Sequence, residues 1–372
     1  MNDPETIYLN HAGTSWPKPK SVVLAASAVM RQSPVCWPDL FEQSHRTVAD
    51  FFHIDPSRLL LTPSCTAALN VAIMDHAWKP GDRIITSRYE HHAVQRNLVK
   101  LQERGVEVRT LPRSNDELID LDALESELKA NDIRLLAITA ACNVTGRLLP
   151  VAEAIDLAHR FGTLVLIDGA QIAGWWDIDV SGLGADLFTF AGHKGLQAPW
   201  GIGGLFVSSH VAMNCPLATC ERSESEADSH CAVMPGYCDV GSVNYAALAG
   251  LAAACHWLSE PGRQSRLEHA RSLAREFTDA LRRLPGVVIH EDVGMERKMP
   301  TVAITVEDIS SAAIATRLRQ EALIVSGGFQ CAPQAHNALG TEGTGVIRFS
   351  FGPNNTATDA ARALEAMATV IG

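Results

Sequence analysis

One stretch decides the fold of this chain: Asp186-Leu-Phe-Thr-Phe-Ala-Gly-His193-Lys194-Gly. A second stretch upstream, Leu164-Val-Leu-Ile-Asp168-Gly-Ala-Gln171, is built in the same way. In each, a short apolar run typical of a buried strand is followed at once by polar residues. The separation of Asp168 and Lys194 suits two neighbouring strands with a connection between them. Both side chains then lie at carboxyl ends of strands, where ligands of open parallel sheets bind.

This carboxylate and this amine suit pyridoxal phosphate. A lysine can form a Schiff base with the cofactor, and a carboxylate can keep the pyridine nitrogen protonated, so that the ring acts as an electron sink. A carboxylate at the end of a buried strand such as Asp168 needs a partner. Lys194 follows an apolar run, which is an unusual place for a merely solvated charge.

The first two thirds of the chain alternate between apolar runs and helical patterns. Between two of the runs, Val151, Ala154, Ile155 and Ala158 fall on one helical face with Pro150 at its start. Such alternation predicts an α/β fold with a mainly parallel sheet and helices on both faces. The expected strands are 83–87, 106–111, 135–139, 164–167, 187–190 and 204–207.

The length of 372 residues predicts two domains. We place the boundary near Gly262, with a large domain of 15–261 and a small domain of 262–372 joined by the N-terminal arm 1–14. In the small domain we expect a long helix ended by Pro285-Gly286, a strand at 301–306, a helix at 312–320 and a short strand around Arg348. Residues 215–239 lack any apolar period, so we expect a long loop there, and Cys215, Cys220, Cys231 and Cys238 within it do not fit common zinc spacings.

Bulk properties exclude several classes of function. The net charge of −11 argues against nucleic acid or an anionic membrane as the main partner, because both favour a basic face. No stretch approaches the ~20 apolar residues of a membrane span. The nine cysteines are scattered, and the N-terminus lacks the pattern of a secretory signal. We therefore expect a cytoplasmic enzyme with reduced thiols.

Three further motifs follow predicted strands. Thr62-Pro-Ser-Cys65-Thr66-Ala-Ala-Leu-Asn70 opens a helix and could hold a phosphate at its N-terminus, although hydroxyl residues commonly cap helices. Glu90-His91-His92-Ala93 offers an imidazole that could stack on a flat cofactor or move protons, or a solvent-facing pair at a helix start. Because no further ligand has a sensible spacing, we expect no metal. Asn143-Val-Thr-Gly146 could be a plain turn.

Taken together, the motifs resemble the class V aminotransferase family of fold-type-I pyridoxal-phosphate enzymes, and within it the cysteine desulfurase and selenocysteine lyase group. The resemblance runs from Tyr8 to Thr356, and the motifs follow the family order. It implies a large domain with a seven-stranded, mostly parallel sheet, and a smaller α+β C-terminal domain. It also implies a homodimer with shared active sites, an amino-acid substrate and a sulfur acceptor.

The resemblance implies a role for each matching position. Lys194 would form the Schiff base, Asp168 would pair with the pyridinium nitrogen, Gln171 would bond the ring oxygen, and His91 would stack on the ring. Cys65, Thr66 and His193 would hold the phosphate, with Ser242 reaching the phosphate of the neighbouring subunit. Asn143 and Arg348, together with His11, would bind the substrate, and Asn143 would also contact the cofactor.

Cys331 decides the reaction that the resemblance implies. It lies in Ser326-Gly-Gly-Phe-Gln-Cys331-Ala-Pro, where a desulfurase has the cysteine that attacks the substrate sulfur. The products would be a persulfide and alanine, from cysteine or selenocysteine. The chain departs from the family pattern at Ser326, Ala191 and Gln330, where arginine, a phosphate-binding Ser or Thr, and histidine are frequent. The presence of Cys331 does not by itself exclude that the chain is a C–S lyase, an aminotransferase, an epimerase or a non-catalytic cofactor-binding relative.

Overall fold

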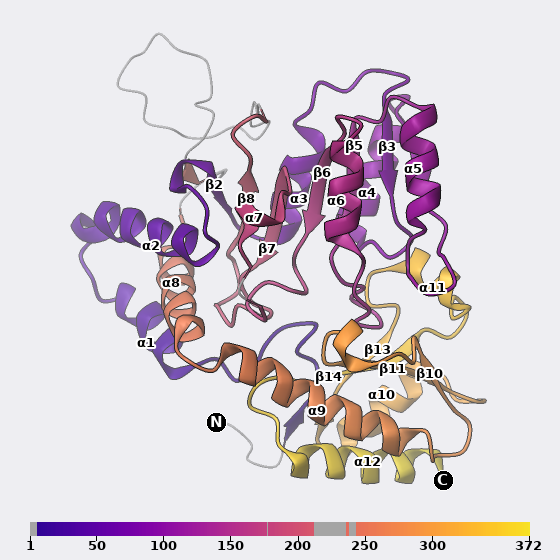
Figure 1. Ribbon diagram of the computed structural model, residues 1–372. Helices are drawn as coiled ribbons and strands as arrows, with labels where there is room; N and C mark the ends of the chain where they lie inside the picture. Colours follow the sequence, from indigo (N-terminus) through magenta and orange to yellow (C-terminus); the bar gives the residue numbers. More distant parts are fainter. Residues whose placement is uncertain (1–5, 177, 212–235, 238–242) are drawn as a thin grey trace.

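The computed structural model describes residues 6–176, 178–211, 236–237 and 243–372. Two main sheets organise the described residues, one above the other in the orientation of Figure 1. The larger sheet has the strand order β4-β3-β5-β6-β7-β8-β2-β9, and the smaller has the order β10-β11-β14-β13. A third, two-stranded sheet joins β1 to β12.

The large sheet is mostly parallel. β4, β3, β5, β6 and β7 run in one direction, whereas β8 is antiparallel to both of its neighbours, β7 and β2. The strands are β2 (Leu59–Thr62), β3 (Arg83–Thr86), β4 (Glu107–Thr110), β5 (Leu135–Thr139), β6 (Leu164–Asp168), β7 (Leu187–Ala191), β8 (Gly203–Val207) and β9 (Gly236–Tyr237). The six strands expected from the apolar runs are β3 to β8. β2 brings the number to the seven that the resemblance implies, and the two-residue β9 adds an eighth beside β2.

Alternate residues of the central strands enter two different cores, because successive side chains point to opposite faces of a sheet. In β5, Leu136 and Ile138 join the core that contains helices α5 and α6, whereas Leu135 and Ala137 join the core that contains α3 and α4. Every residue of β5 is buried. This double burial explains why the strands are continuous apolar runs.

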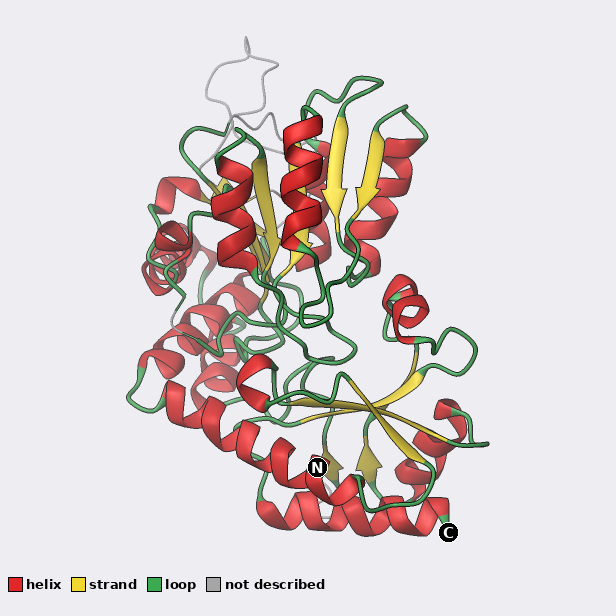
Figure 2. Cartoon of the chain, turned by 45° about the vertical axis from the view of Figure 1, so that its right-hand side comes forward, coloured by secondary structure: helices red, strands yellow, loops and turns green. Residues whose placement is uncertain are grey.

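Helices cover both faces of the large sheet and one face of the small sheet. Those of the first two thirds are α1 (Lys20–Val29), α2 (Trp37–Phe51), α3 (Cys65–Met74), α4 (His92–Gln102), α5 (Leu121–Ala130), α6 (Val151–His159), α7 (Val180–Leu183) and α8 (Tyr245–Ser259). Those that follow are α9 (Arg263–Leu281), α10 (Ser311–Gln320), α11 (Pro333–Leu339) and α12 (Ala357–Ile371). The long helices α9 and α12 lie side by side beneath the small sheet (Figures 1 and 2).

The small sheet is antiparallel and comprises β10 (Val287–His290), β11 (Thr301–Val306), β13 (Ser326–Gly328) and β14 (Val346–Ser350). The N-terminal segment joins this part of the molecule, because β1 (Ile7–Tyr8) pairs in parallel with β12 (Leu323–Ile324). The backbone N–H of His11 also donates to the carbonyl of Ser350 at 3.2 Å. These contacts support the arm assignment, while the boundary near Gly262, the residue before α9, stays a prediction.

The expected elements agree with the structure to within a few residues. The helix predicted from Val151 is α6, and Ala154, Ile155 and Ala158 on its predicted face are buried. The long C-terminal helix is α9, which ends at Leu281, before the predicted stop at Pro285-Gly286. Most of the expected loop 215–239, including Cys215, Cys220, Cys231 and Cys238, lies outside the described residues, as does Ser242.

Candidate active site

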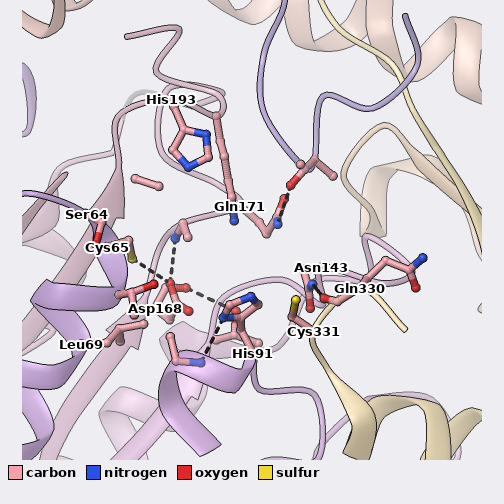
Figure 3. A pocket seen from close by; sticks show the side chains of 18 of the residues that line it. Ser64, Cys65, Leu69, His91, Asn143, Asp168, Gln171, His193, Gln330 and Cys331 are labelled. Carbon is pink, nitrogen blue, oxygen red and sulfur yellow. Dashed lines mark hydrogen bonds between the residues drawn. The ribbon is translucent and has the colours of Figure 1, made fainter. Parts of the chain in front are cut away.

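A cavity of about 360 Å³ opens where the carboxyl ends of β5, β6 and β7 face the small sheet. This volume lies in the range of small-molecule sites. The cavity is lined by residues from both parts of the molecule, including Cys65, Thr66, His91, Asn143, Asp168, Gln171, His193, Lys194, Cys331 and Arg348. Figure 3 shows His91, Asp168 and Cys331 approaching it from different elements. The fold thus brings nearly all of the predicted site residues to one cavity.

Asp168 is the last residue of β6 and is buried. Its Oδ1 accepts from the N–H of Ala170 at 3.0 Å and from the Cys65 thiol at 3.7 Å. Burial raises the pKa of Asp168, because desolvation disfavours its charged form. No cation within the described residues forms an ion pair with it, so a cationic partner in the cavity would relieve the cost of burying the carboxylate.

Lys194 follows the end of β7 and lines the same cavity. Within the described part of the chain, its amine makes no hydrogen bond or ion pair. Burial lowers the pKa of Lys194, which favours the neutral, nucleophilic amine. The turn that carries it is closely packed: a Cβ at Gly195 would lie 2.5 Å from the Ala173 carbonyl oxygen. The backbone from which Lys194 projects is therefore well defined.

His91 caps the N-terminus of α4, where its Nδ1 accepts from the N–H of Ala93 at 3.1 Å. Burial, followed by the charge of Lys194, lowers the pKa of His91 to about 4, so the imidazole is neutral near pH 7. The preceding Glu90 is 0% exposed and accepts from the Ser87 hydroxyl at 2.5 Å and the Thr139 N–H at 3.0 Å. Glu90 thereby ties the start of α4 to the end of β5 and positions His91.

The N-terminus of α3 borders the cavity and offers a site for an anion. Ser64 caps this helix by accepting from the N–H of Ala67 at 3.2 Å, and Thr66 is exposed. The thiol of Cys65 instead points to Asp168 and Thr189, and burial raises the pKa of Cys65 well above its ordinary value. Such a thiol is a poor anion ligand, so only the backbone N–H of Cys65 suits a phosphate.

His193 offers a further polar atom to the cavity. Its Nδ1 is buried and has no hydrogen-bond partner among the described residues, although His193 lines the cavity. Burial lowers the pKa of His193 to about 4, with the charges of Lys194 and Lys18 adding to the effect. A neutral imidazole can donate one hydrogen bond to a bound group.

Arg348, from β14, is 4% exposed. Its Nη1 donates to the Asn143 backbone carbonyl at 2.6 Å, and its Nη2 donates to Asn10 Oδ1 at 2.9 Å. Both acceptors are neutral, and within the described ranges Arg348 Nε has no hydrogen-bond partner. Burial lowers the pKa of Arg348 to about 10, which still leaves the guanidinium charged near pH 7. A buried cation held only by neutral groups is suited to an anionic ligand.

The segment around Cys331 is fixed by contacts to the large sheet side of the cavity. The Cys331 carbonyl accepts from the His92 N–H at 2.8 Å, and the Gln330 carbonyl accepts from Asn143 Nδ2 at 2.6 Å. Gln330 Nε2 also donates to the Val346 carbonyl at 3.2 Å. Both Gln330 and Cys331 have left-handed backbones, with φ of 43° and 57°, which non-glycine residues rarely adopt. The Cys331 residue remains exposed beside the cavity.

Two predicted residues have different surroundings from those expected. Asn143 donates its amide N–H to the Gln330 carbonyl, which leaves its Oδ1 buried without a partner in the part of the chain that the structure describes. His11 does not line the main cavity. It borders a smaller one behind Gln171, because its backbone pairs with Ser350 and its ring packs against Gly352, where a Cβ would lie 2.1 Å away. Its neighbour Asn10 lines the main cavity instead.

The described ranges contain no group of three or more His, Cys, Asp or Glu side chains arranged to hold a metal ion. None of the helices within these ranges is long and apolar enough to span a membrane.

The family model described as Aminotransferase class-V matches residues 7–362. The chain therefore belongs to the class-V aminotransferase family, whose members are pyridoxal-phosphate-dependent enzymes, and it is an enzyme of this class. The fold agrees, because the mostly parallel sheet and the placement of Asp168 and Lys194 are those that the sequence predicted.

Within this family the chain is similar to proteins named cysteine desulfurases. Cysteine desulfurase CsdA of Escherichia coli (strain K12) is 32% identical over 376 residues, covering 95% of this chain and 91% of that protein. The crystal structure of cysteine desulfurase CsdA (S-sulfonic acid) from Escherichia coli superposes on this chain with a TM-score of 0.88 at 28% identity. The superposition covers 99% of this chain and 95% of the other. The apo cysteine desulfurase from Thermococcus onnurineus NA1 has a TM-score of 0.91 at 25% identity, with the same coverage.

Proposed function

We propose that this protein is a pyridoxal-phosphate-dependent cysteine desulfurase that removes sulfur from L-cysteine, or selenium from selenocysteine, and leaves L-alanine. One observation carries the proposal. The Cys331 thiol, the Lys194 amine and the Arg348 guanidinium all line one cavity, although they come from three different segments.

The residues of the cavity fit the cofactor. When bound, pyridoxal phosphate would supply an electron sink that stabilises negative charge developing on the substrate. Lys194 would form the covalent link, and buried Asp168 would pair with the ring N–H, which would return its carboxylate to the charged form. The N-terminus of α3 with Thr66, and the unpartnered Nδ1 of His193, suit the phosphate. Neutral His91 suits the flat face of the ring.

The remaining polar groups suit an amino acid. Arg348 would bind its carboxylate in a charge-assisted pair, and the free Oδ1 of Asn143 would accept a hydrogen bond from an N–H or O–H group of the amino acid or of the cofactor. Gln171 Nε2 donates one of its two hydrogens to the Ala12 carbonyl at 3.2 Å. The other hydrogen would donate to the ring oxygen of the cofactor. Asn10 would hold Arg348 in place from the other side.

Cys331 would carry out the sulfur transfer. Its thiolate would attack the substrate sulfur and form an S–S bond while the substrate C–S bond breaks. The electron pair of that bond would remain on the substrate β-carbon, which takes up a proton and becomes the methyl group of alanine. Exposure of Cys331 would let a sulfur acceptor reach the resulting persulfide. His91 and Lys194, both facing the cavity, would hold or move protons.

A homodimer with shared sites is part of this proposal. Exposed apolar residues lie on and after α1, including Met30 at 81% and Val35 at 85% exposure, and a second copy would cover them. In that dimer Ser242 would contribute to the partner's phosphate site. We also propose a cytoplasmic location, which the five free cysteines of the described residues support.

The test is product analysis by mass spectrometry with a panel of sulfur and selenium amino acids. Desulfuration yields alanine and transferable sulfur in equal amounts. Pyruvate with ammonia would replace this proposal by a C–S lyase, and a requirement for a keto acid would replace it by an aminotransferase. Loss of chirality without sulfur release would indicate an epimerase. Binding of the cofactor without turnover of any substrate in the panel would indicate a non-catalytic relative.

A further inference from the structure

Four donors from one short segment converge on the backbone carbonyl of His193, the residue before Lys194. They are the Ser15 N–H at 2.9 Å, the Ser15 hydroxyl at 3.0 Å, the Thr14 hydroxyl at 3.1 Å and the Lys18 ammonium at 2.9 Å. A carbonyl oxygen has two lone pairs, so this number of donors is unusual. Residues 14–18 thus hold the peptide bond that leads into Lys194.

Lys18 is the one charged group among these donors. Its ammonium also donates to the Ser15 hydroxyl at 2.7 Å and lies 5.4 Å from the centre of the Trp200 ring. None of the described carboxylates forms an ion pair with it. Burial lowers the pKa of Lys18 to about 7, so this amine is fully charged only below neutral pH. A half-buried lysine without an acidic partner needs an explanation other than surface solubility.

The segment 8–18, which continues the arm beyond residue 14, spans the distance between the two halves of the site. At its other end, the Ala12 N–H donates to the Ser350 hydroxyl at 2.9 Å, and the Ser350 N–H donates to the Leu9 carbonyl at 2.8 Å. Ser350 lies two residues after Arg348 on β14. Within this segment, the Tyr8 hydroxyl donates to the Thr14 carbonyl at 2.8 Å. The segment 8–18 therefore connects the strand that carries Arg348 to the turn that carries Lys194.

We propose that Lys18 is a positioning residue, whose amine binds the His193 carbonyl and so fixes the backbone that carries Lys194. The inference rests on the proposed role of Lys194 and deepens it. A fixed peptide bond restricts the positions that the Lys194 amine can reach.

The test compares Lys18→Met with the wild type in two measurements that need no substrate. In the cofactor-free protein, hydrogen exchange of the amides in 192–198 should be roughly tenfold faster in the variant, because a charged anchor of this turn is gone. In the holoenzyme, the pH midpoint of the visible cofactor band should shift, because a less restrained turn changes how close the Lys194 nitrogen lies to Asp168 and Arg348, whose charges act on its pKa. Lys18→Arg should restore the midpoint in part.

The matched control is Lys20→Met, which removes an exposed lysine at the start of α1. It should leave both measurements at their wild-type values. The proposal is overturned if Lys18→Met changes neither the exchange of 192–198 nor the pH midpoint, even where the variant is less stable to heat. Neither measurement depends on sulfur release. If the wild type releases no sulfur, the proposed function fails, but the role of Lys18 can still be tested.

Discussion

The Arg348 guanidinium donates to the backbone carbonyl of Asn143 at 2.6 Å, so the arginine of β14 rests on the turn that follows β5. The side chain of Asn143 also holds the Gln330 carbonyl, next to Cys331. One asparagine therefore positions both the proposed anion site and the proposed nucleophile. Because its contacts to both are through neutral groups, it leaves the charge of Arg348 free for a substrate.

Replacing Arg348 by alanine should raise the apparent KM for the amino acid while leaving the cofactor band intact. A charge-assisted pair contributes on the order of 1.5–3 kcal/mol, which corresponds to an increase of roughly ten- to a hundredfold. Arg348→Lys should recover only part, since an ammonium cannot make the two-pronged contact. Steady-state kinetics measure the effect, and an unchanged KM in the alanine variant would place the carboxylate site elsewhere.

Replacing Cys331 by serine should abolish sulfur release, because a hydroxyl cannot form the persulfide. The drop should be at least roughly a hundredfold, whereas the cofactor band and its response to added cysteine should persist. Cys36→Ser, which removes another exposed thiol near the start of α2, is the control and should keep full activity. Full sulfur release from Cys331→Ser would show that the nucleophile is a different group.

Replacing Lys194 by alanine should remove the visible absorption of the purified protein together with all turnover. The amine is the group in the cavity that can bond covalently to an aldehyde, and its pKa is lowered by burial so that it is available in the neutral form. Absorption spectra with and without added cofactor provide the measurement. A wild type that stays colourless after addition of pyridoxal phosphate would contradict the cofactor assignment itself.

The parts of the site that lie at strand ends could be predicted from sequence. Asp168 and Lys194 each follow a buried apolar run, and this local signal fixes both their place in the sheet and their shared edge. The motif that carries Cys331 could be read only by resemblance, because its left-handed residues and its contacts to His92 have no periodic signature.

The groups that support the site could not be predicted in this way. Asn10 meets Arg348 across 338 residues, and Lys18 meets the His193 carbonyl across 175 residues. Such pairs depend on how the arm crosses between the two sheets, which no local pattern records. The same limit applies to β9, since a two-residue strand is too short to show alternation. Asn10, the neighbour of His11, lines the main cavity, and a role of His11 in substrate binding stays a prediction.

Glu90 gives a prediction about pH and stability. Burial raises its pKa to about 8 from an ordinary 4.5, although the Ser87 and Thr139 hydrogen bonds oppose the shift. The folded protein then binds more protons at Glu90 than the unfolded chain does between these two values. Its contribution to stability is therefore fully present below about pH 4.5 and is lost as the pH rises through about 8.

Glu90→Gln removes this titration while keeping a carbonyl oxygen able to accept from Thr139. The difference in unfolding free energy between variant and wild type should therefore shift in favour of the variant as the pH rises from about 5 to 8, by on the order of a few kcal/mol. Denaturant unfolding at several pH values measures this difference, in which the titration of all other groups cancels. Glu125→Gln, on the surface of α5, is a control that should show no such trend. A difference that stays flat across this range would mean that Glu90 is already ionised in the folded protein, and that His91 is positioned by a charged carboxylate.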